Sequence, residues 1–314
     1  MELTNNIKKR FVKDFRLPIT IFQEPYFSYF IDLYNPIYKT EEKLNLLYQL
    51  LESYKNEEDF FQKNKEITTK IKEIIIASKS YEKFNSINLN EFQLKNNISN
   101  KNIYIEENID KPLISIDLKQ ANFNIFRLFG LQKELNIKTY EDLIFMFSKE
   151  KYFTESKMIR QIIFGELNPS RQQRFQKYVI QSLAEKLLEN GCEIFSASSD
   201  EIIVKNKTNP YEIQNILKDV ESNFQFFRVE QFSFNKIDKE HDFYLKKTIT
   251  MDGEKKIEFK NVPSYFFAQV YKKAYELEIH EYDLMFYYEG FLAKFQENLF
   301  QNNLKKTIDT KRKL

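Results

Sequence analysis

The chain has few of the residues that build redox and zinc sites. Its 314 residues include one cysteine, Cys192, two histidines and no tryptophan. A single cysteine excludes an internal disulfide and is typical of a reducing compartment. Two histidines and one cysteine also argue against a zinc centre and against a Cys/His or Ser/His nucleophilic site.

Glycine, proline and long hydrophobic runs are scarce as well. Five glycines and seven prolines predict long regular elements rather than many tight turns. No apolar run approaches the roughly 18 residues that a membrane span requires, and the charged N-terminus lacks a signal-peptide core. We therefore expect a cytoplasmic protein with no membrane partner.

A strong charge of either sign is also missing. The 48 Lys and Arg nearly balance the 46 Asp and Glu, which leaves a net charge of +2. Nucleic-acid binding would therefore need a local basic groove rather than a global positive field. The abundance of Lys, Asn and Ile indicates an A/T-rich genome, cellular or viral, and says nothing about function.

The chain is rich in core-forming residues. Apolar residues make up 42% of it, with 31 Phe and 19 Tyr among them. Hydrophobic periodicity predicts an α+β fold in three regions. These are a mainly helical region 1–112, a central core 113–204, and an α+β region 205–314 packed on that core. Secondary structure is expected as helices at 41–83 (the second from 66 to 84), 119–129, 139–168, 171–190, 211–222, 264–279 and 283–304, strands at 113–117 and 224–234, and hairpins at 193–204 and 243–259.

The stretch 193–204 carries the most informative turn. Two runs of β-branched and aromatic residues flank a Ser/Asp turn that contains Asp200 and Glu201, which predicts a β-hairpin. A carboxylate at a hairpin tip is held rigidly and can bind a divalent metal ion. The alternative is a solvated acidic turn.

Asp117 occupies a comparable position. It ends the short apolar run 113–117, and the next residues change to helical spacing. The carboxylate is therefore expected where a strand turns into a helix, a place at which α/β layers often bind ligands. The alternative is that Asp117 merely caps the strand end.

Two predicted helices carry cations. Lys157 and Arg160 share a helix face with Phe164, because the three positions are i, i+3 and i+7. Such a face suits a ligand with phosphates and a ring. On the next helix, the cations with i, i+3 and i+6 spacing can follow a phosphate backbone, and a solvated face is the alternative. These cations are Arg171, Arg174 and Lys177.

Three motifs together resemble the polymerase signature of family A, the DNA polymerase I type. Asp117-Leu-Lys-Gln120 resembles motif A, and Arg160-Gln-Ile-Ile-Phe164-Gly165 resembles motif B with Arg in place of Lys. Ser199-Asp200-Glu201-Ile-Ile-Val resembles motif C with Ser in place of His. The motifs occur in the family's order, within residues 113–204.

The resemblance implies a palm-like antiparallel sheet with surrounding helices and reduced fingers. Asp117 and Asp200 would be the catalytic metal ligands, with Glu201 as a nearby carboxylate. The implied cofactor is a pair of Mg²⁺ ions, for which Mn²⁺ can substitute. Nucleotide-binding roles are implied for Arg160, Phe164, Gln120 and Asn122, with Lys157, which precedes motif B, as a supporting candidate.

Departures from the family pattern affect the expected activity. Asn122 stands where the family has the glutamate that crowds the ribose 2′-hydroxyl, which leaves the choice between deoxy- and ribonucleotides open. Only 34 residues separate Gly165 from Asp200, so the fingers are expected to be short. Short fingers leave nucleotide addition without a template as an open alternative. Over a hundred residues follow motif C.

The leading hypothesis is a minimal nucleotidyltransferase that extends a nucleic-acid 3′ end from nucleoside triphosphates, with or without a template. The first alternative is a catalytically inactive, polymerase-derived nucleic-acid-binding protein of replication or of a virion. The second is an unrelated α+β protein whose motifs match by chance. Convergence of Asp117 and Asp200 in space is the feature that separates the last alternative from the others.

Overall fold

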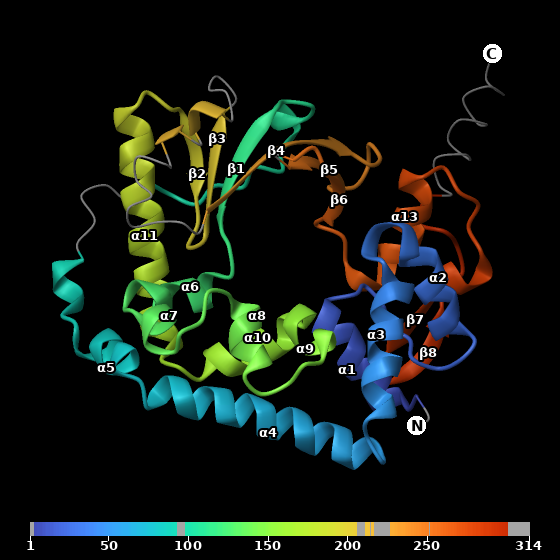
Figure 1. Ribbon diagram of the computed structural model, residues 1–314. Helices are drawn as coiled ribbons and strands as arrows, with labels where there is room; N and C mark the ends of the chain where they lie inside the picture. Colours follow the sequence, from blue (N-terminus) through green and yellow to red (C-terminus); the bar gives the residue numbers. More distant parts are fainter. Residues whose placement is uncertain are drawn as a thin grey trace.

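The computed structural model describes residues 3–92, 98–205, 211–213, 215–216, 227–250 and 252–300. The N-terminal region is helical, as predicted, and its helices lie along the base and one side of the molecule (Figure 1). They are α1 (Asn5–Phe15), α2 (Tyr26–Tyr38), α3 (Thr40–Glu52), α4 (Glu57–Ile76) and α5 (Lys79–Ser86).

Helix α4 is longer at its start than the sequence pattern predicts. Asn56 caps it by accepting a hydrogen bond from the Asp59 amide, and three acidic residues follow in the first turn, where they complement the helix dipole. Ser78 caps α5 in the same way. The predicted helix 66–84 is therefore wrong at both of its bounds: α4 already begins at Glu57, and α5 is a separate helix.

Six strands of the described chain form one antiparallel sheet in the order β2-β3-β1-β4-β5-β6, which confirms the predicted α+β class. The strands are β1 (Leu113–Leu118), β2 (Ile194–Ala197), β3 (Glu201–Lys205), β4 (Phe227–Lys236), β5 (Tyr244–Thr250) and β6 (Lys255–Lys260). Helices connect β1 to β2, and residues 211–213 and 215–216 are helical between β3 and β4. This connectivity with the order β2-β3-β1-β4 is a split β-α-β arrangement.

The helices between β1 and β2 pack below and beside the sheet (Figure 1). They are α6 (Ala121–Leu128), α7 (Leu131–Glu134), α8 (Tyr140–Phe145), α9 (Lys151–Glu155), α10 (Lys157–Gly165) and α11 (Pro169–Glu189). The predicted helix 139–168 is thus three short helices. Beyond 205, the prediction of a helix at 211–222 and of a strand from 224 falls partly outside the described residues.

Strand alternation gives the sheet two different faces, of which one is apolar along the whole of β1. In β1 the side chains of Ile114, Ile116 and Leu118 are at most 4% exposed and belong to the main hydrophobic core, together with residues of α6 and α11. Ser115 and Asp117 point to the opposite face, because successive side chains of a strand alternate. That opposite face carries the polar groups of the central strands.

Part of the opposite face is covered by the segment 98–112. The buried side chain of Ile103 packs there against Leu113, Phe232 and Phe234, and Lys101 donates a backbone hydrogen bond to Ser196. This segment has no strand and only the short 3-10 turn Glu106–Asn108. It covers the Leu113 end of β1, so the polar residues gather near the Asp117 end.

The N-terminal helices also contact the C-terminal segment. The buried ring of Tyr34 on α2 lies 5.4 Å from the ring of Phe267 on α13 (Phe267–Ala274), and the Tyr29 hydroxyl donates to Asp283 over 2.8 Å. The main core contains residues of α1–α5, of the sheet and of α13. The chain therefore closes on itself through aromatic packing.

The predicted helix 283–304 is wrong. The structure has a hairpin there, formed by β7 (Met285–Tyr288) and β8 (Phe291–Lys294). Its turn residues Glu289 and Gly290 have φ of 49° and 87°, the left-handed pair that a two-residue hairpin loop requires. The Glu-Gly dipeptide between two aromatic runs is the sequence feature that could have predicted this hairpin.

Candidate functional site

The pairing of β1 with β3 brings the three predicted carboxylates together. Asp117 lies directly opposite Glu201, and the Leu118 amide donates to the Asp200 carbonyl over 2.8 Å. These residues are more than 80 positions apart in the chain. Asp117 and the turn that carries Asp200 and Glu201 are therefore neighbours at the end of β1.

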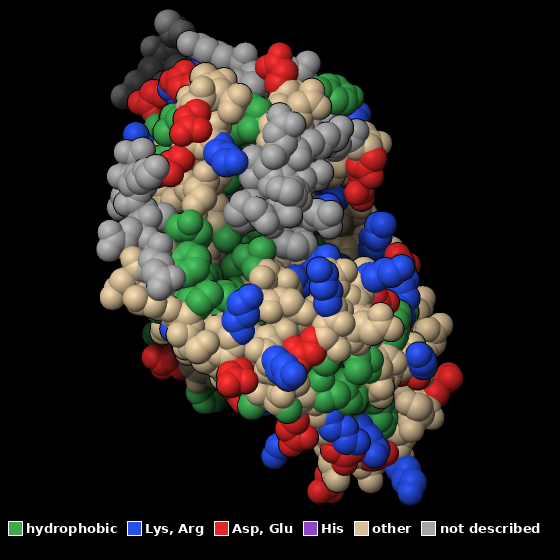
Figure 2. Space-filling model, turned by 60° about the vertical axis from the view of Figure 1, so that its left-hand side comes forward, with side chains coloured by type: hydrophobic (Ala, Val, Ile, Leu, Met, Phe, Trp, Pro, Cys, Tyr) green, Lys and Arg blue, Asp and Glu red, His purple; other side chains and the backbone are tan. Residues whose placement is uncertain are grey.

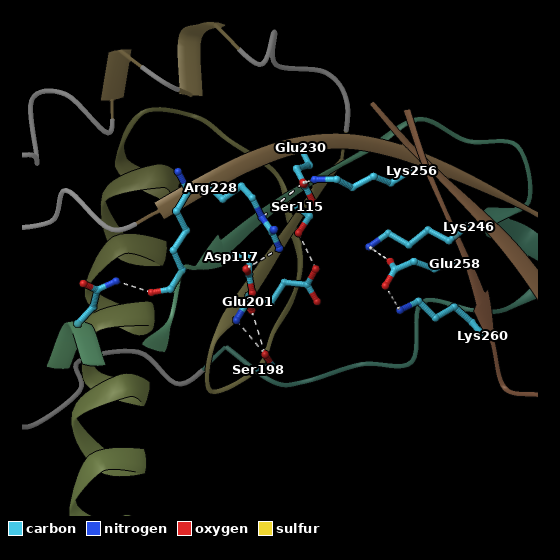
Figure 3. A network of polar contacts seen from close by, with 12 residues as sticks. Ser115, Asp117, Ser198, Glu201, Arg228, Glu230, Lys246, Lys256, Glu258 and Lys260 are labelled. Carbon is cyan, nitrogen blue, oxygen red and sulfur yellow. Dashed lines mark hydrogen bonds and ion pairs between the residues drawn. The ribbon is translucent and has the colours of Figure 1, made fainter. Parts of the chain in front are cut away.

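Two serines hold the acidic hairpin. The Ser198 hydroxyl accepts a hydrogen bond from the Glu201 amide and contacts the Asp200 carboxylate, both over 3.0 Å. Ser115 donates to Glu201 Oε1 over 2.5 Å. Figure 3 shows Ser115 and Ser198 on either side of Glu201. Glu201 is thus tied to β1 by both its backbone pairing and its side chain.

Arg228 on β4 completes the cluster from the other side of β1, and the sequence analysis did not identify it. It lies opposite Asp117 in the β1–β4 register, and its Nη2 donates to Asp117 Oδ2 over 2.9 Å. Its Nε lies 3.4 Å from Glu230 Oε1, which Lys256 also approaches to 3.7 Å (Figure 3). The alternating Phe-Arg-Val-Glu pattern of β4, with opposite charges on one face, was the available signal.

The environment raises the pKa of Asp117. Burial of the carboxylate is the largest cause, and the neighbouring negative charges of Glu201 and Asp200 add to it, whereas the Arg228 guanidinium acts in the opposite direction. The Arg228 guanidinium therefore does not fully offset the effect of burial on this carboxylate.

The donor chemistry of the cluster fits Mg²⁺. Carboxylate oxygens are its preferred protein ligands, and Mg²⁺ typically takes only one or two of them beside substrate phosphates and water. Hydrogen bonds to other described residues engage one oxygen of each carboxylate. The described residues contain no group of three or more His, Cys, Asp or Glu arranged around a metal position. A metal ion here would depend on a ligand to complete its shell.

A basic pocket adjoins Asp117. It has a volume of about 520 Å³ and extends from Asp117 to α6, α8 and α10. Six cationic residues line it, against two acidic ones, Asp117 and Glu141. The cations are Lys119, Arg127, Lys138, Lys157, Arg160 and Arg228. This excess of positive charge suits a polyanionic ligand such as a chain of phosphates.

Helix α10 places two of these cations. Its N-cap is the buried Ser156, which accepts from the Ile159 amide and donates to the buried Asp14 on α1 over 2.7 Å. With the helix anchored in this way, Arg160 lies over the ring of Tyr140 at 5.4 Å. Burial and the nearby charges of Arg16 and Arg160 lower the pKa of Lys157. Lys157 and Arg160 therefore share the basic pocket.

Phe164 does not line the basic pocket. Its ring is fully buried and packs in the core against Phe126 at 5.8 Å and Phe123 at 6.2 Å. The helical spacing correctly places Phe164 on the same face of α10 as Lys157 and Arg160. It does not predict that neighbouring helices cover the Phe164 end of that face. The ring has no exposed surface on which a nucleotide base could stack.

The two motif A candidates are separated. Gln120 lines the basic pocket and donates to Glu141 over 3.2 Å. Asn122 instead accepts a hydrogen bond from Gln176 of α11 over 2.6 Å and is not among the pocket residues. Its side chain therefore links α6 to α11, and a role as the sugar gate finds no support in this geometry.

The three cations predicted on α11 also differ from one another. Arg171 donates from Nε to the Phe84 carbonyl over 2.6 Å and from Nη2 to the Ile87 carbonyl, so it holds the end of α5. Arg174 and Lys177 are exposed. In Figure 2, which brings the α11 side forward, Lys and Arg side chains are interspersed with Asp and Glu across the described surface. No broad basic track is visible there.

A second hollow, which we call the lateral groove, lies beside the basic pocket. It has a volume of about 690 Å³ and is bounded by the loop from α2 to α3 and by β4–β6. It shares Lys157 and Arg228 with the basic pocket. Cations outnumber acidic residues six to three, and Tyr38 and Tyr275 add ring surface. The cations are Lys39, Lys43, Lys157, Arg228, Lys255 and Lys256.

Comparison with known proteins adds no family assignment. No protein-family model matches the chain, and no curated protein matches it. In the described part of the chain, no helix has both the length and the apolar character to cross a bilayer. Inference about function therefore depends on the site itself.

Proposed function

We propose that the protein is a nucleotidyltransferase that adds nucleotides from nucleoside triphosphates to a nucleic-acid 3′ end. The observation that carries this proposal is that Asp117, which lies beside Glu201 and the Asp200 turn in the sheet, also lines the basic pocket. Acidic groups alone suit a cation, and basic groups alone suit a phosphate. Their contact in one site suits a metal-bound polyphosphate.

The basic pocket would hold the triphosphate. Arg160 and Lys157 lie on the wall formed by α10, and Arg228, bound to Asp117, lines the same pocket. A guanidinium group binds phosphate oxygens through paired N–H donors, and its charge does not titrate near neutral pH. Gln120 offers a neutral hydrogen-bonding group in the same pocket. The base or ribose would have to contact side chains other than Phe164.

Asp117 and Asp200 would hold Mg²⁺, with Glu201 kept beside them by Ser115. Bound Mg²⁺ supplies Lewis-acid stabilisation of the charge that develops on phosphoryl oxygens. The protein residues orient the triphosphate against the metal ligands and exclude part of the solvent, since Asp117 is only 27% exposed in its side chain. Mn²⁺ accepts the same oxygen ligands and is a convenient probe.

The lateral groove is the best-supported path for the nucleic-acid strand. Two of its cations, Lys157 and Arg228, also line the basic pocket. A basic groove with aromatic residues can bind a single strand through its phosphates and bases. A strand end in this groove would approach Asp117 from the β4 side.

A nucleic-acid-binding protein without catalysis is the second candidate. The observation in its favour is that Arg228 already neutralises Asp117, while serines hold Asp200 and Glu201. Such a network is satisfied without a metal ion. A binding protein would retain affinity for strand ends and would add no nucleotide.

Primer extension separates the two candidates. Labelled single strands and primed templates are incubated with dNTPs or NTPs and with Mg²⁺ or Mn²⁺, beside the variant Asp200→Asn. Extension that disappears in this variant would support transfer, and the substrate pattern would show whether a template is read. Strand binding with no extension on any substrate would favour the binding protein.

Arg160→Met is expected to weaken nucleotide binding by about 10- to 100-fold, the scale of one lost charge-assisted hydrogen bond. The reason is that Arg160 lines the basic pocket and not the lateral groove. Single-strand affinity should change much less. Titration of a fluorescent nucleotide and of a labelled oligonucleotide measures both quantities. Arg174→Met, an exposed arginine on α11, is the control, and equal losses for both ligands would contradict the assigned role.

The double variant Lys39→Gln/Lys255→Gln tests the lateral groove. Both lysines are exposed and line opposite sides of it. If each contacts a phosphate, the slope of log affinity against log salt should fall by about 1.4 for a single strand. Fluorescence anisotropy at several salt concentrations measures the slope. Lys70→Gln/Lys83→Gln changes the net charge equally at exposed sites on α4 and α5, and an equal effect there would refute the groove.

A further inference from the structure

Arg228 has an unusual position in this site. Its guanidinium is bound to Asp117, yet its side chain is 44% exposed and lines both the basic pocket and the lateral groove. It therefore contacts a proposed metal ligand and, at the same time, faces the space proposed for the triphosphate. The N–H donors of the guanidinium that bind the Asp117 carboxylate cannot bind an incoming phosphate at the same time.

We propose that Arg228 is a positioning residue that couples nucleotide binding to cation binding. In the ligand-free protein it occupies the Asp117 carboxylate. When a nucleoside triphosphate enters the basic pocket, Arg228 transfers to a phosphate, and the released carboxylate becomes available to a divalent cation. This inference rests on the proposed function, because it takes a nucleotide as the ligand of the basic pocket.

The surroundings of Arg228 keep the free-energy cost of such a transfer small. An ion pair with one partner 44% and the other 27% exposed contributes little stability. Glu230, the second acidic contact of Arg228, also lies 3.7 Å from Lys256. The nearly buried Glu230 would therefore keep a cationic partner after Arg228 moved away.

The transfer also explains why an arginine lies where a metal ligand is expected. Asp117 at the end of β1 is flanked by Asp200, Glu201 and Glu230, whose negative charges would repel one another in an empty site. A guanidinium balances this cluster until a divalent cation replaces it. The cation then arrives only with the phosphates that complete its shell.

The test is nucleotide binding in EDTA, where no metal ion contributes, measured by titration of a fluorescent nucleoside triphosphate. Arg228→Met should weaken binding about tenfold, through loss of one charged phosphate contact. Asp117→Asn should strengthen binding by up to about tenfold, because it frees Arg228 and removes a negative charge. If the Arg228–Asp117 ion pair only fixed the β1–β4 register, the two substitutions would not shift the nucleotide affinity in opposite directions.

A second measurement uses the cation alone. Mn²⁺ binding without nucleotide, followed by electron paramagnetic resonance, should be at least about tenfold tighter in Arg228→Met than in the wild type, since a bound guanidinium no longer competes. The gain should disappear in the double variant Asp117→Asn/Arg228→Met. Equal Mn²⁺ affinity in the wild type and Arg228→Met, or a gain that persists in the double variant, would overturn the proposal.

Thermal unfolding of each variant, with Arg228→Lys as the charge-conserving form, shows whether the fold is retained. The outcomes distinguish the two levels of inference. If the wild-type protein binds no nucleotide, with or without Mg²⁺, both the proposed function and the coupling are wrong. A wild type that binds nucleotide, with Arg228→Met and Asp117→Asn shifting affinity in the same direction, would overturn the coupling alone.

Discussion

Asp117→Asn is expected to reduce nucleotide addition by at least about 10²- to 10³-fold, the scale on which one preorganised electrostatic group acts in catalysis. The substitution preserves the shape of the side chain but removes the charge that lies against Asp200, Glu201 and Arg228. Asp200→Asn should have a similar effect. Single-turnover primer extension measures the loss for each variant.

The same variant should keep its fold. Burial and neighbouring negative charges raise the pKa of Asp117 above the unfolded value, so the folded state binds this proton more tightly than the unfolded state does. The stability that this group contributes is present below the unfolded pKa and is lost as the pH rises through the folded pKa. At neutral pH the ionised carboxylate therefore costs stability, and Asn should unfold at the same or a higher temperature.

Oligonucleotide binding is the control for this prediction. The cations of the lateral groove are unchanged in Asp117→Asn, so single-strand affinity should persist or rise slightly. Extension at the wild-type rate would remove Asp117 from the catalytic group. Loss of folding, seen as a lowered unfolding temperature, would assign the carboxylate a structural role instead.

Phe164→Ala is expected to destabilise the protein by about 3–5 kcal/mol, the usual cost of deleting a buried phenyl ring. The ring is fully buried and contacts Phe123, Phe126 and Tyr140 from two neighbouring helices. Its removal leaves a cavity that these large rings cannot readily fill. Urea unfolding followed by circular dichroism measures the change.

A matched variant separates packing from ligand contact. Phe291→Ala removes the same ring from a residue that is 77% exposed on β8, and it should change stability within about 0.5 kcal/mol, as most surface substitutions do. If Phe164 instead stacked on a nucleotide, Phe164→Ala would lower nucleotide affinity while leaving the unfolding midpoint unchanged. That result would contradict the buried position of the ring.

The sequence alone determined the local elements of the site. The short apolar run 113–117 predicts a strand that ends at Asp117, and the Ser/Asp turn predicts the hairpin that carries Asp200 and Glu201. Both patterns depend on neighbours within a few residues, where backbone preference and side-chain period act directly. The same local rules placed Lys157 and Arg160 on one side of a helix.

Only the tertiary structure decided which of these side chains meet. Arg228 reaches Asp117 across 111 positions of sequence, and this contact depends on the β1–β4 register, which no local pattern specifies. The burial of Phe164 under Phe123 and Phe126, and the turn of Asn122 toward Gln176, follow from how α6, α10 and α11 pack. Periodicity assigns a residue to a face of its own element. The packing of distant elements decides whether that face becomes core, pocket wall or solvent-exposed surface.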